Sequence, residues 1–121
     1  MKDGKLYSEV TKENAKARAD AAPQNIEAWR NFSRTVFKAG ALDAKTKQLI
    51  AVAVAHVTQC PYCIHSHTPQ AMKAGATKEE IMEAIWVAAE MRAGAAYAHS
   101  VMAMEEIMEV EAAGKVEKAD I

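Results

Sequence analysis

The sequence has no long, uninterrupted apolar run and no excess of either charge. Its first twenty residues, MKDGKLYSEVTKENAKARAD, are polar and contain no apolar core of a secretory signal, so none is expected. Fifteen basic and sixteen acidic residues leave a formal net charge of −1, and the two signs alternate along the chain. We therefore expect no nucleic-acid partner and no binding to an anionic membrane surface. The stretch from Ile81 to Met104 is rich in Ala and Met, but its charged residues argue against a transmembrane helix.

Cysteine is scarce, and its placement is informative. The chain has two cysteines, Cys60 and Cys63, within the eight-residue run CPYCIHSH. A structural disulfide closing so short a loop would add little stability. Because we expect the protein in the cytoplasm, a reducing compartment, the C-x-x-C pair indicates thiol redox chemistry rather than a structural bridge.

The local sequence predicts that a helix begins at this pair. Pro61 suits the first helical position, which makes Cys60 the expected N-cap. Thiols in a first turn lie near unpaired N–H groups and the positive end of the helix dipole, which stabilises a thiolate. Cys63 and His67 are four residues apart and should share one helical face, whereas His65 should point to another side.

Two other readings of the cysteines stay open at this point. Cys60, Cys63, His65 and His67 are all zinc-ligand types, with His56 or His99 as replacements for His65, but structural zinc sites usually combine two separated pairs. The cysteines could also be buried and inert. No metal and no cofactor is predicted.

Helical periodicity and capping signals predict an all-α single domain over residues 1–121, with its core at about residues 25–110. No segment shows β alternation. We expect about six helices and a frayed tail at residues 114–121. The expected helices are a polar one at 8–21, one from Pro23 to Gly40, one capped by Asp43 and ending near Thr58, one from Pro61 to Gly75, one after a capping box of Thr77 and Glu80, and one from Ala95 to about Ala112 beyond a bend or break at Arg92-Ala93-Gly94.

Several large residues have simple expected roles. The third helix, with LIAVAVAHVTQ, is apolar on nearly every side and is predicted to be buried on all of them. Trp29 and Trp86 are expected to be packing anchors. Six methionines at helical spacing are expected to fill the core or subunit contacts: Met72, Met82, Met91, Met102, Met104 and Met108.

The motif Gln48-(eleven residues)-Cys60-Pro-Tyr-Cys63-(three residues)-His67, followed by AGATKEEIMEAIWVAAEMRAGAAYAH, resembles the carboxymuconolactone decarboxylase-like superfamily, and within it the AhpD-like alkylhydroperoxidase branch. The resemblance covers roughly residues 25–110. It implies a helical bundle in which a buried hairpin carries the cysteines. It also implies a homo-oligomer, a trimer or a hexamer.

The resemblance implies a function as well. Members with both cysteines reduce hydroperoxides: one thiolate becomes a sulfenic acid, the other closes a disulfide, and a thiol reductant restores the pair. By position, Cys63 would attack and Cys60 would resolve, with His67 in the proton relay. We therefore expect a thiol-dependent peroxidase or disulfide oxidoreductase acting on a small hydroperoxide or disulfide. The alternatives are a decarboxylase-type enzyme, which the cysteine pair disfavours, and a metal-binding or non-enzymatic member.

One position departs from the family motif. The family has a relay glutamate twelve residues before the first cysteine, where this chain has Gln48, and an amide cannot accept the proton. His56 is the first candidate to replace the glutamate, because it lies one turn before Cys60. Glu90 is a second candidate, with Arg92 or His99 as its partner.

Overall fold

The computed structural model describes residues 6–120, with side chains described as far as Gly114. Helices are the only regular elements of the described residues, which contain no strand, and this confirms the all-α prediction. It has five helices: α1 (Lys12–Ala21), α2 (Pro23–Phe37), α3 (Ala44–Thr58), α4 (Pro61–Lys73) and α5 (Lys78–Asp120).

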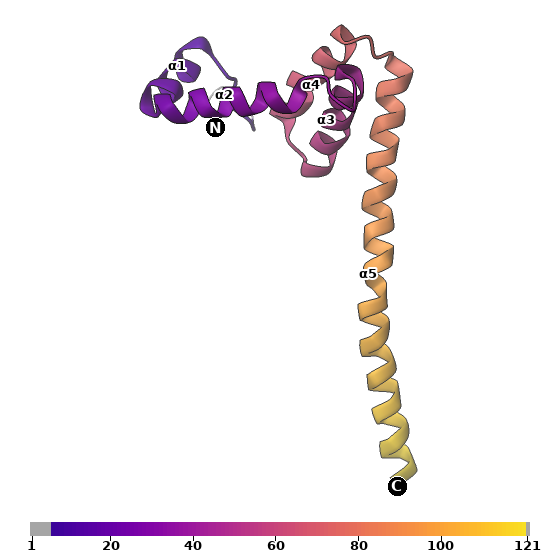
Figure 1. Ribbon diagram of the computed structural model, residues 1–121. Helices are drawn as coiled ribbons and strands as arrows, with labels where there is room; N and C mark the ends of the chain where they lie inside the picture. The colour runs from indigo at the N-terminus through magenta and orange to yellow at the C-terminus, as the bar shows by residue number, and fades with distance from the viewer. Residues whose placement is uncertain (1–5, 121) are drawn as a thin grey trace.

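The helices form a small core with two extensions. α3 packs against both α4 and α5, while α1 and α2 reach away from this core on one side. The first part of α5 runs beside α3, and the rest extends away from the core toward the C-terminus (Figure 1). The buried cluster consists of Val52, Ala71, Ala76 and Ile81, with Leu49 and Ile85 packed against it.

The prediction of six helices is wrong, because α5 continues through Arg92-Ala93-Gly94 without a break. One glycine costs a helix only about 1 kcal/mol relative to alanine, and its alanine neighbours are the strongest helix formers. The Arg92 side chain also donates to the Val57 carbonyl at 3.0 Å, which ties this turn to the end of α3. The tail expected to be frayed lies mostly on residues whose side chains are not described, and Ile121 lies outside the described residues.

The first helix begins later than predicted, at Lys12 rather than Ser8. Thr11 and Asn14 form a reciprocal capping box, in which each side chain accepts a hydrogen bond from the other residue's backbone N–H, at 3.1 and 3.0 Å. This cap fixes the start of α1. Residues 8–10 before it are therefore extended chain.

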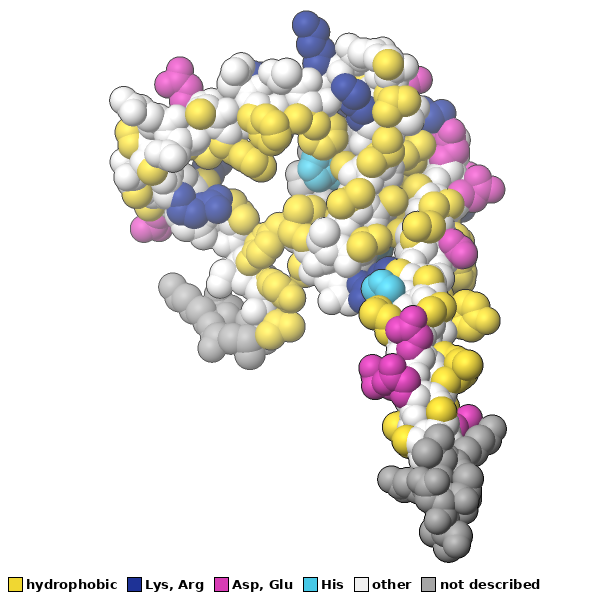
Figure 2. All heavy atoms as spheres, turned by 60° about the horizontal axis from the view of Figure 1, so that its bottom comes forward, with side chains coloured by type: hydrophobic (Ala, Val, Ile, Leu, Met, Phe, Trp, Pro, Cys, Tyr) yellow, Lys and Arg dark blue, Asp and Glu magenta, His cyan; other side chains and the backbone are white. Residues whose placement is uncertain are grey.

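Much apolar surface stays exposed. α3 is not buried on all sides as predicted, since Ile50, Val54 and Val57 are 47%, 51% and 43% exposed. Trp29 and Trp86 are also exposed, so neither anchors the core of the chain. The six methionines expected in the core or in subunit contacts are 46–61% exposed. Hydrophobic side chains accordingly cover much of the face shown in Figure 2.

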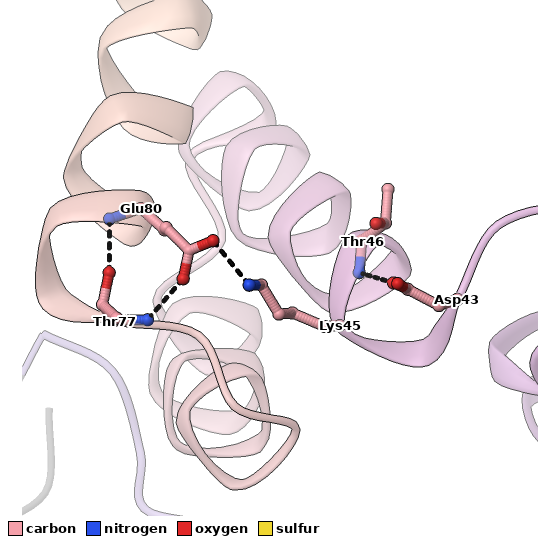
Figure 3. A network of polar contacts seen from close by, with 5 residues as sticks. All are labelled: Asp43, Lys45, Thr46, Thr77 and Glu80. Atoms are coloured by element: carbon pink, nitrogen blue, oxygen red, sulfur yellow. Dashed lines mark hydrogen bonds and ion pairs between the residues drawn. The ribbon is translucent and has the colours of Figure 1, made fainter.

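The starts of α3 and α5 are capped by the residues that the sequence predicts. Asp43 accepts from the Thr46 N–H at 2.7 Å and caps α3. Thr77 and Glu80 form the expected capping box of α5, at 3.1 and 2.9 Å. Figure 3 shows that Glu80 also forms an ion pair with Lys45 of α3, at 2.6 Å. The Lys45 ammonium lowers the pKa of the Glu80 carboxyl, and the starts of α3 and α5 are joined.

The fourth helix, α4, stops just before Gly75, as predicted. The Gly75 φ of +100° lies in the left-handed region that glycine adopts without strain. The Gly75 N–H donates to the Met72 carbonyl and the Ala76 N–H to the Ala71 carbonyl, at 3.0 and 2.9 Å. These bonds satisfy the last carbonyls of α4 and turn the chain toward α5.

Candidate functional site

The two cysteines lie at the start of α4, as the sequence predicts. Cys60 is the N-cap and Pro61 the first helical residue. The Cys60 sulfur accepts a hydrogen bond from the Cys63 N–H at 3.3 Å, and the two Sγ atoms are 2.7 Å apart. Both thiols are free and half-buried. The pair can therefore pass between dithiol and disulfide with little movement of the backbone.

The two thiols are electrostatically unequal. The Cys63 S–H donates to the Cys60 sulfur, and the Cys63 backbone N–H adds a second donor, so the pKa of the Cys60 thiol is lowered. The same S–H bond, together with burial, raises the pKa of the Cys63 thiol. The first proton to leave the pair is therefore the one on Cys60.

His67 is held on the same face of α4 by a residue from α3. The Gln48 Oε1 atom lies 2.8 Å from His67 Nδ1, and Gln48 is buried. With this amide oxygen as acceptor, Nδ1 is the donor, and Nε2 is the ring atom left free to exchange a proton. The Gln48 Nε2 atom lies 3.5 Å from Gln70 Oε1, and Gln70 in turn donates to the Ser66 carbonyl and hydroxyl, each at 3.1 Å.

Phe37, the last residue of α2, completes the support of this imidazole. Its ring lies over His67 with centroids 5.0 Å apart and an interplanar angle of 24°. Lys47 donates to the Val36 carbonyl at 2.7 Å and so fixes the end of α2 against α3. The His67 ring is thus fixed from two sides, by an amide in its plane and by a phenyl ring on its face.

Cys63 and His67 open onto one cavity of about 690 Å³ between α4 and the N-terminal part of the chain. Tyr62 and Ser66 complete the α4 side. The opposite side is formed by Ser8, Glu9, Val10, Asn14, Arg18 and Trp29. Cys60 is not among the lining residues, so a ligand in the cavity meets Cys63 first.

The structure brings Gln48, Cys60, Cys63 and His67 together, but it places His56 elsewhere. The His56 Nδ1 atom lies 2.7 Å from the Val52 carbonyl of its own helix, and His56 does not line the cavity.

The other relay candidates lie on the exposed part of α5. Glu90, Arg92 and His99 are all exposed, and none lines the cavity. Arg92 bonds to the Val57 carbonyl instead of pairing with Glu90. Among these candidates, Gln48 is the residue whose side chain lies within hydrogen-bond distance of His67.

The alternative of a zinc site requires several ligand side chains close together. In the described part of the chain, no three His, Cys, Asp or Glu side chains lie close enough to hold a metal ion. His65 does not line the cavity of Cys63 and His67. It lines an adjoining hollow with Tyr7 and Pro61, and the two hollows share Tyr62 and Ser66.

Sequence reasoning missed Phe37, Gln70 and the cavity wall formed by residues 8–18. Gln70 could have been found, because it lies seven residues, or two turns, after Cys63 on the same side of a helix. Phe37 and Arg18 give no local signal. They reach the site only through tertiary packing.

Comparison with known proteins places this site in a family. Residues 23–106 match the Carboxymuconolactone decarboxylase family. A Paracoccus denitrificans protein named "Uncharacterized protein 4 in cox locus" is 62% identical over 87 residues, which are 72% of this chain and 78% of that protein.

Two solved structures resemble this chain in both sequence and fold. A carboxymuconolactone decarboxylase family protein from Legionella pneumophila is 35% identical, with a TM-score of 0.62 over 65% of this chain and 70% of that one. A protein from Methanobacterium thermoautotrophicum is 36% identical, with a TM-score of 0.64 over 67% of this chain and 91% of that one. The chain therefore belongs to the carboxymuconolactone decarboxylase family.

Proposed function

We propose that this protein is a thiol-dependent peroxidase or disulfide oxidoreductase of the AhpD-like kind, and that Cys60 and Cys63 are its redox pair. The observation that carries the proposal is the arrangement of three groups. Cys63 and His67 line one cavity, and the Cys60 sulfur lies 2.7 Å behind Cys63. A substrate reaches one thiol while the other stands ready to resolve the product.

The reaction with a hydroperoxide begins at Cys63, the thiol that faces the cavity. Its proton passes to the Cys60 thiolate or to Nε2 of His67, which leaves Cys63 as the nucleophile. The Cys63 sulfur attacks the distal oxygen of R–O–OH, the O–O bond breaks, and the alkoxide takes a proton to leave as the alcohol. Cys63 is then a sulfenic acid.

Cys60 resolves this intermediate. Its thiolate attacks the Cys63 sulfur, the S–O bond breaks, and hydroxide leaves as water after taking a proton. The balance is a dithiol and a hydroperoxide giving a disulfide, an alcohol and water. An external dithiol then reduces the Cys60–Cys63 disulfide by exchange. A reducing compartment such as the cytoplasm would supply that reductant.

In this proposal His67 transfers the proton, and Gln48 orients the His67 ring. The Gln48 oxygen fixes the Nδ1–H tautomer, so that Nε2 is free to take a proton and return it to the leaving oxygen. An amide cannot neutralise an imidazolium as a glutamate would. We therefore expect slower thiol activation than a glutamate at this position would give.

We also propose that the working protein is a homo-oligomer. The chain exposes 9991 Å² of surface, whereas a compact monomer of 13.2 kDa exposes about 6,400 Å². On α5, the large side chains of Tyr97, Val101 and Val110 are 82%, 62% and 70% exposed. A second copy packed on this helix would remove these side chains from water, which favours association.

The cysteine variants test the chemistry. With dithiothreitol as reductant, Cys63→Ser should abolish consumption of cumene hydroperoxide. After removal of the dithiothreitol, pre-reduced Cys60→Ser should consume one equivalent of peroxide and leave a sulfenic acid on Cys63 that dimedone traps. If both variants consume peroxide as fast as the wild type, the assignment of the pair is wrong. Decarboxylation of a lactone acid by both variants would support the decarboxylase alternative instead.

A further inference from the structure

The far wall of the cysteine cavity is built by residues before the family match. The match begins at residue 23, whereas Ser8, Glu9, Val10, Asn14 and Arg18 face Cys63 and His67 across the cavity. Figure 2 shows a hollow between this part of the chain and the core. This wall of the cavity therefore lies outside the part of the chain that the family match covers.

The wall is held in place by contacts with the cysteine helix. The Tyr62 hydroxyl, on the residue just before Cys63, donates to the Ser8 carbonyl at 2.7 Å. The Tyr62 ring also meets Tyr7 edge to face, with centroids 5.9 Å apart. Asn14 donates to the Glu9 carbonyl at 2.9 Å, which ties residues 8–10 to the start of α1. These contacts fix the position of the wall relative to Cys63.

The chemistry of the lining is mixed. Val10, Trp29 and Tyr62 supply apolar surface, and Arg18 supplies a permanent positive charge. Within the described residues, Arg18 makes no ion pair. A guanidinium binds a carboxylate through two parallel hydrogen bonds, so an unpaired arginine in a substrate cavity favours an anionic ligand. Glu9 is the one carboxylate in the lining, and it opposes such a ligand.

We propose that Arg18 is a specificity residue that selects a carboxylate-bearing organic hydroperoxide, with an apolar body resting against Val10 and Trp29. The inference rests on the proposed thiol function. The cavity volume of about 690 Å³ accommodates an organic molecule of this kind, and hydrogen peroxide would leave the apolar wall and Arg18 unused.

A binding experiment tests the proposal without turnover. The probes are cumyl alcohol carrying a para carboxylate and its methyl ester, which have the product's shape and no reactive O–O bond. Quenching of Trp29 fluorescence, measured on the reduced protein in a Trp86→Phe background, reports binding. We expect the acid to bind about tenfold more tightly than the ester, and Arg18→Gln to abolish the difference.

Three further variants sharpen this result. Arg18→Lys should keep part of the preference, because the charge remains without the two-pronged geometry. Glu9→Gln should tighten binding of the acid. Arg30→Gln should change nothing, since Arg30 lines a different hollow on α2. Equal affinity for acid and ester in the wild type would overturn the proposal, as would an Arg18→Gln variant that loses both ligands equally.

Kinetics with the matching hydroperoxides complete the test. Arg18→Gln should raise KM for the acid about tenfold, leave its kcat unchanged, and leave both constants for the ester unchanged. If Arg18-dependent binding is found but no hydroperoxide is reduced, the proposed function fails while the selectivity for carboxylates stands. If hydroperoxides are reduced with equal KM for acid and ester, the selectivity fails while the proposed function stands.

Discussion

Cys60 occupies the N-cap of α4, and its sulfur receives hydrogen bonds from both the S–H and the N–H of Cys63. These bonds stabilise the thiolate of Cys60 and hold the proton on Cys63. Cys60 is therefore the more readily ionised thiol of the pair. Cys63, which meets the substrate in the proposed reaction, has to pass its proton to a neighbour before it can attack.

Removing Cys63 should therefore change the titration of Cys60. In the wild type, the thiolate absorbance near 240 nm should rise at a pH below the ordinary thiol value of about 8.5. In Cys63→Ala the main donor is lost, so the pKa of Cys60 should move upward and the thiolate should form only at higher pH. In Cys60→Ala the pKa of Cys63 should move downward, toward the ordinary value. An unchanged midpoint in Cys63→Ala would contradict the hydrogen-bonded pair.

Gln48 is the second residue at which a single change is informative. Gln48→Glu places a carboxylate beside His67 Nδ1, where it can stabilise the imidazolium and share in proton transfer. We expect the oxidation of the dithiol by peroxide to accelerate about 10- to 100-fold. Gln48→Leu, which removes the hydrogen bond without adding charge, should slow it. Stopped-flow rates for the three proteins provide the comparison, and a Gln48→Glu variant no faster than the wild type would show that proton transfer does not limit the step.

The capping residues explain which helices the sequence predicts well. The side chains of Asp43, Cys60 and Thr77 each accept a hydrogen bond from the backbone N–H three residues later, so the capping signal is local in the sequence. The predicted break at Gly94 fails because one glycine is a weak signal against a long run of helix formers. Residues 8–11 are extended because the Thr11 cap begins the helix, although polar composition alone favours an earlier start.

The continuity of α5 can be tested at Gly94 itself. A Cβ added there would meet Glu90 Oε1 at 3.5 Å, an ordinary van der Waals contact. Gly94→Ala should therefore raise the free energy of unfolding by about 0.5–1 kcal/mol, as expected for a helix interior. Thermal unfolding followed by circular dichroism measures this. A destabilised Gly94→Ala variant would indicate that the chain bends at this glycine after all.

The whole molecule is poorly buried for its size. Its buried apolar side chains are few and mostly alanine, and α5 extends well beyond the core (Figure 1). In the described part of the chain, no helix combines the length and the apolar character needed to cross a bilayer. In the homo-oligomer proposed above, a further copy of this chain would cover the exposed side chains of α5. Most of a helix's stability in a protein comes from tertiary packing, so such a cover would stabilise α5.

Light scattering on the purified protein should give a mass that is a multiple of 13.2 kDa. Val101→Glu should lower that mass and the helical content together, because an uncovered α5 loses its stabilising partner. Glu106→Gln is the matched control, since it lies roughly 140° around the helix from Val101. A monomeric wild-type protein with full helical content would contradict the proposed assembly.

Sequence alone predicts the candidate thiol site better than the walls of its cavity. Cys60, Cys63 and His67 follow from their spacing on one helix, and Gln48 follows from the resemblance to the family motif. Arg18, Phe37 and Trp29 reach the site through the path of the first two helices, which no local pattern encodes. Their positions therefore require the structure.

The most direct test of the account is the intact mass of the reduced, metal-free protein before and after one equivalent of an organic hydroperoxide, timed by stopped flow. The account predicts a rapid loss of about two mass units, as the Cys60–Cys63 dithiol becomes a disulfide. The alcohol should form in equal amount. An unchanged mass, or oxidation no faster than that of a free thiol, would contradict a peroxidatic role for this pair.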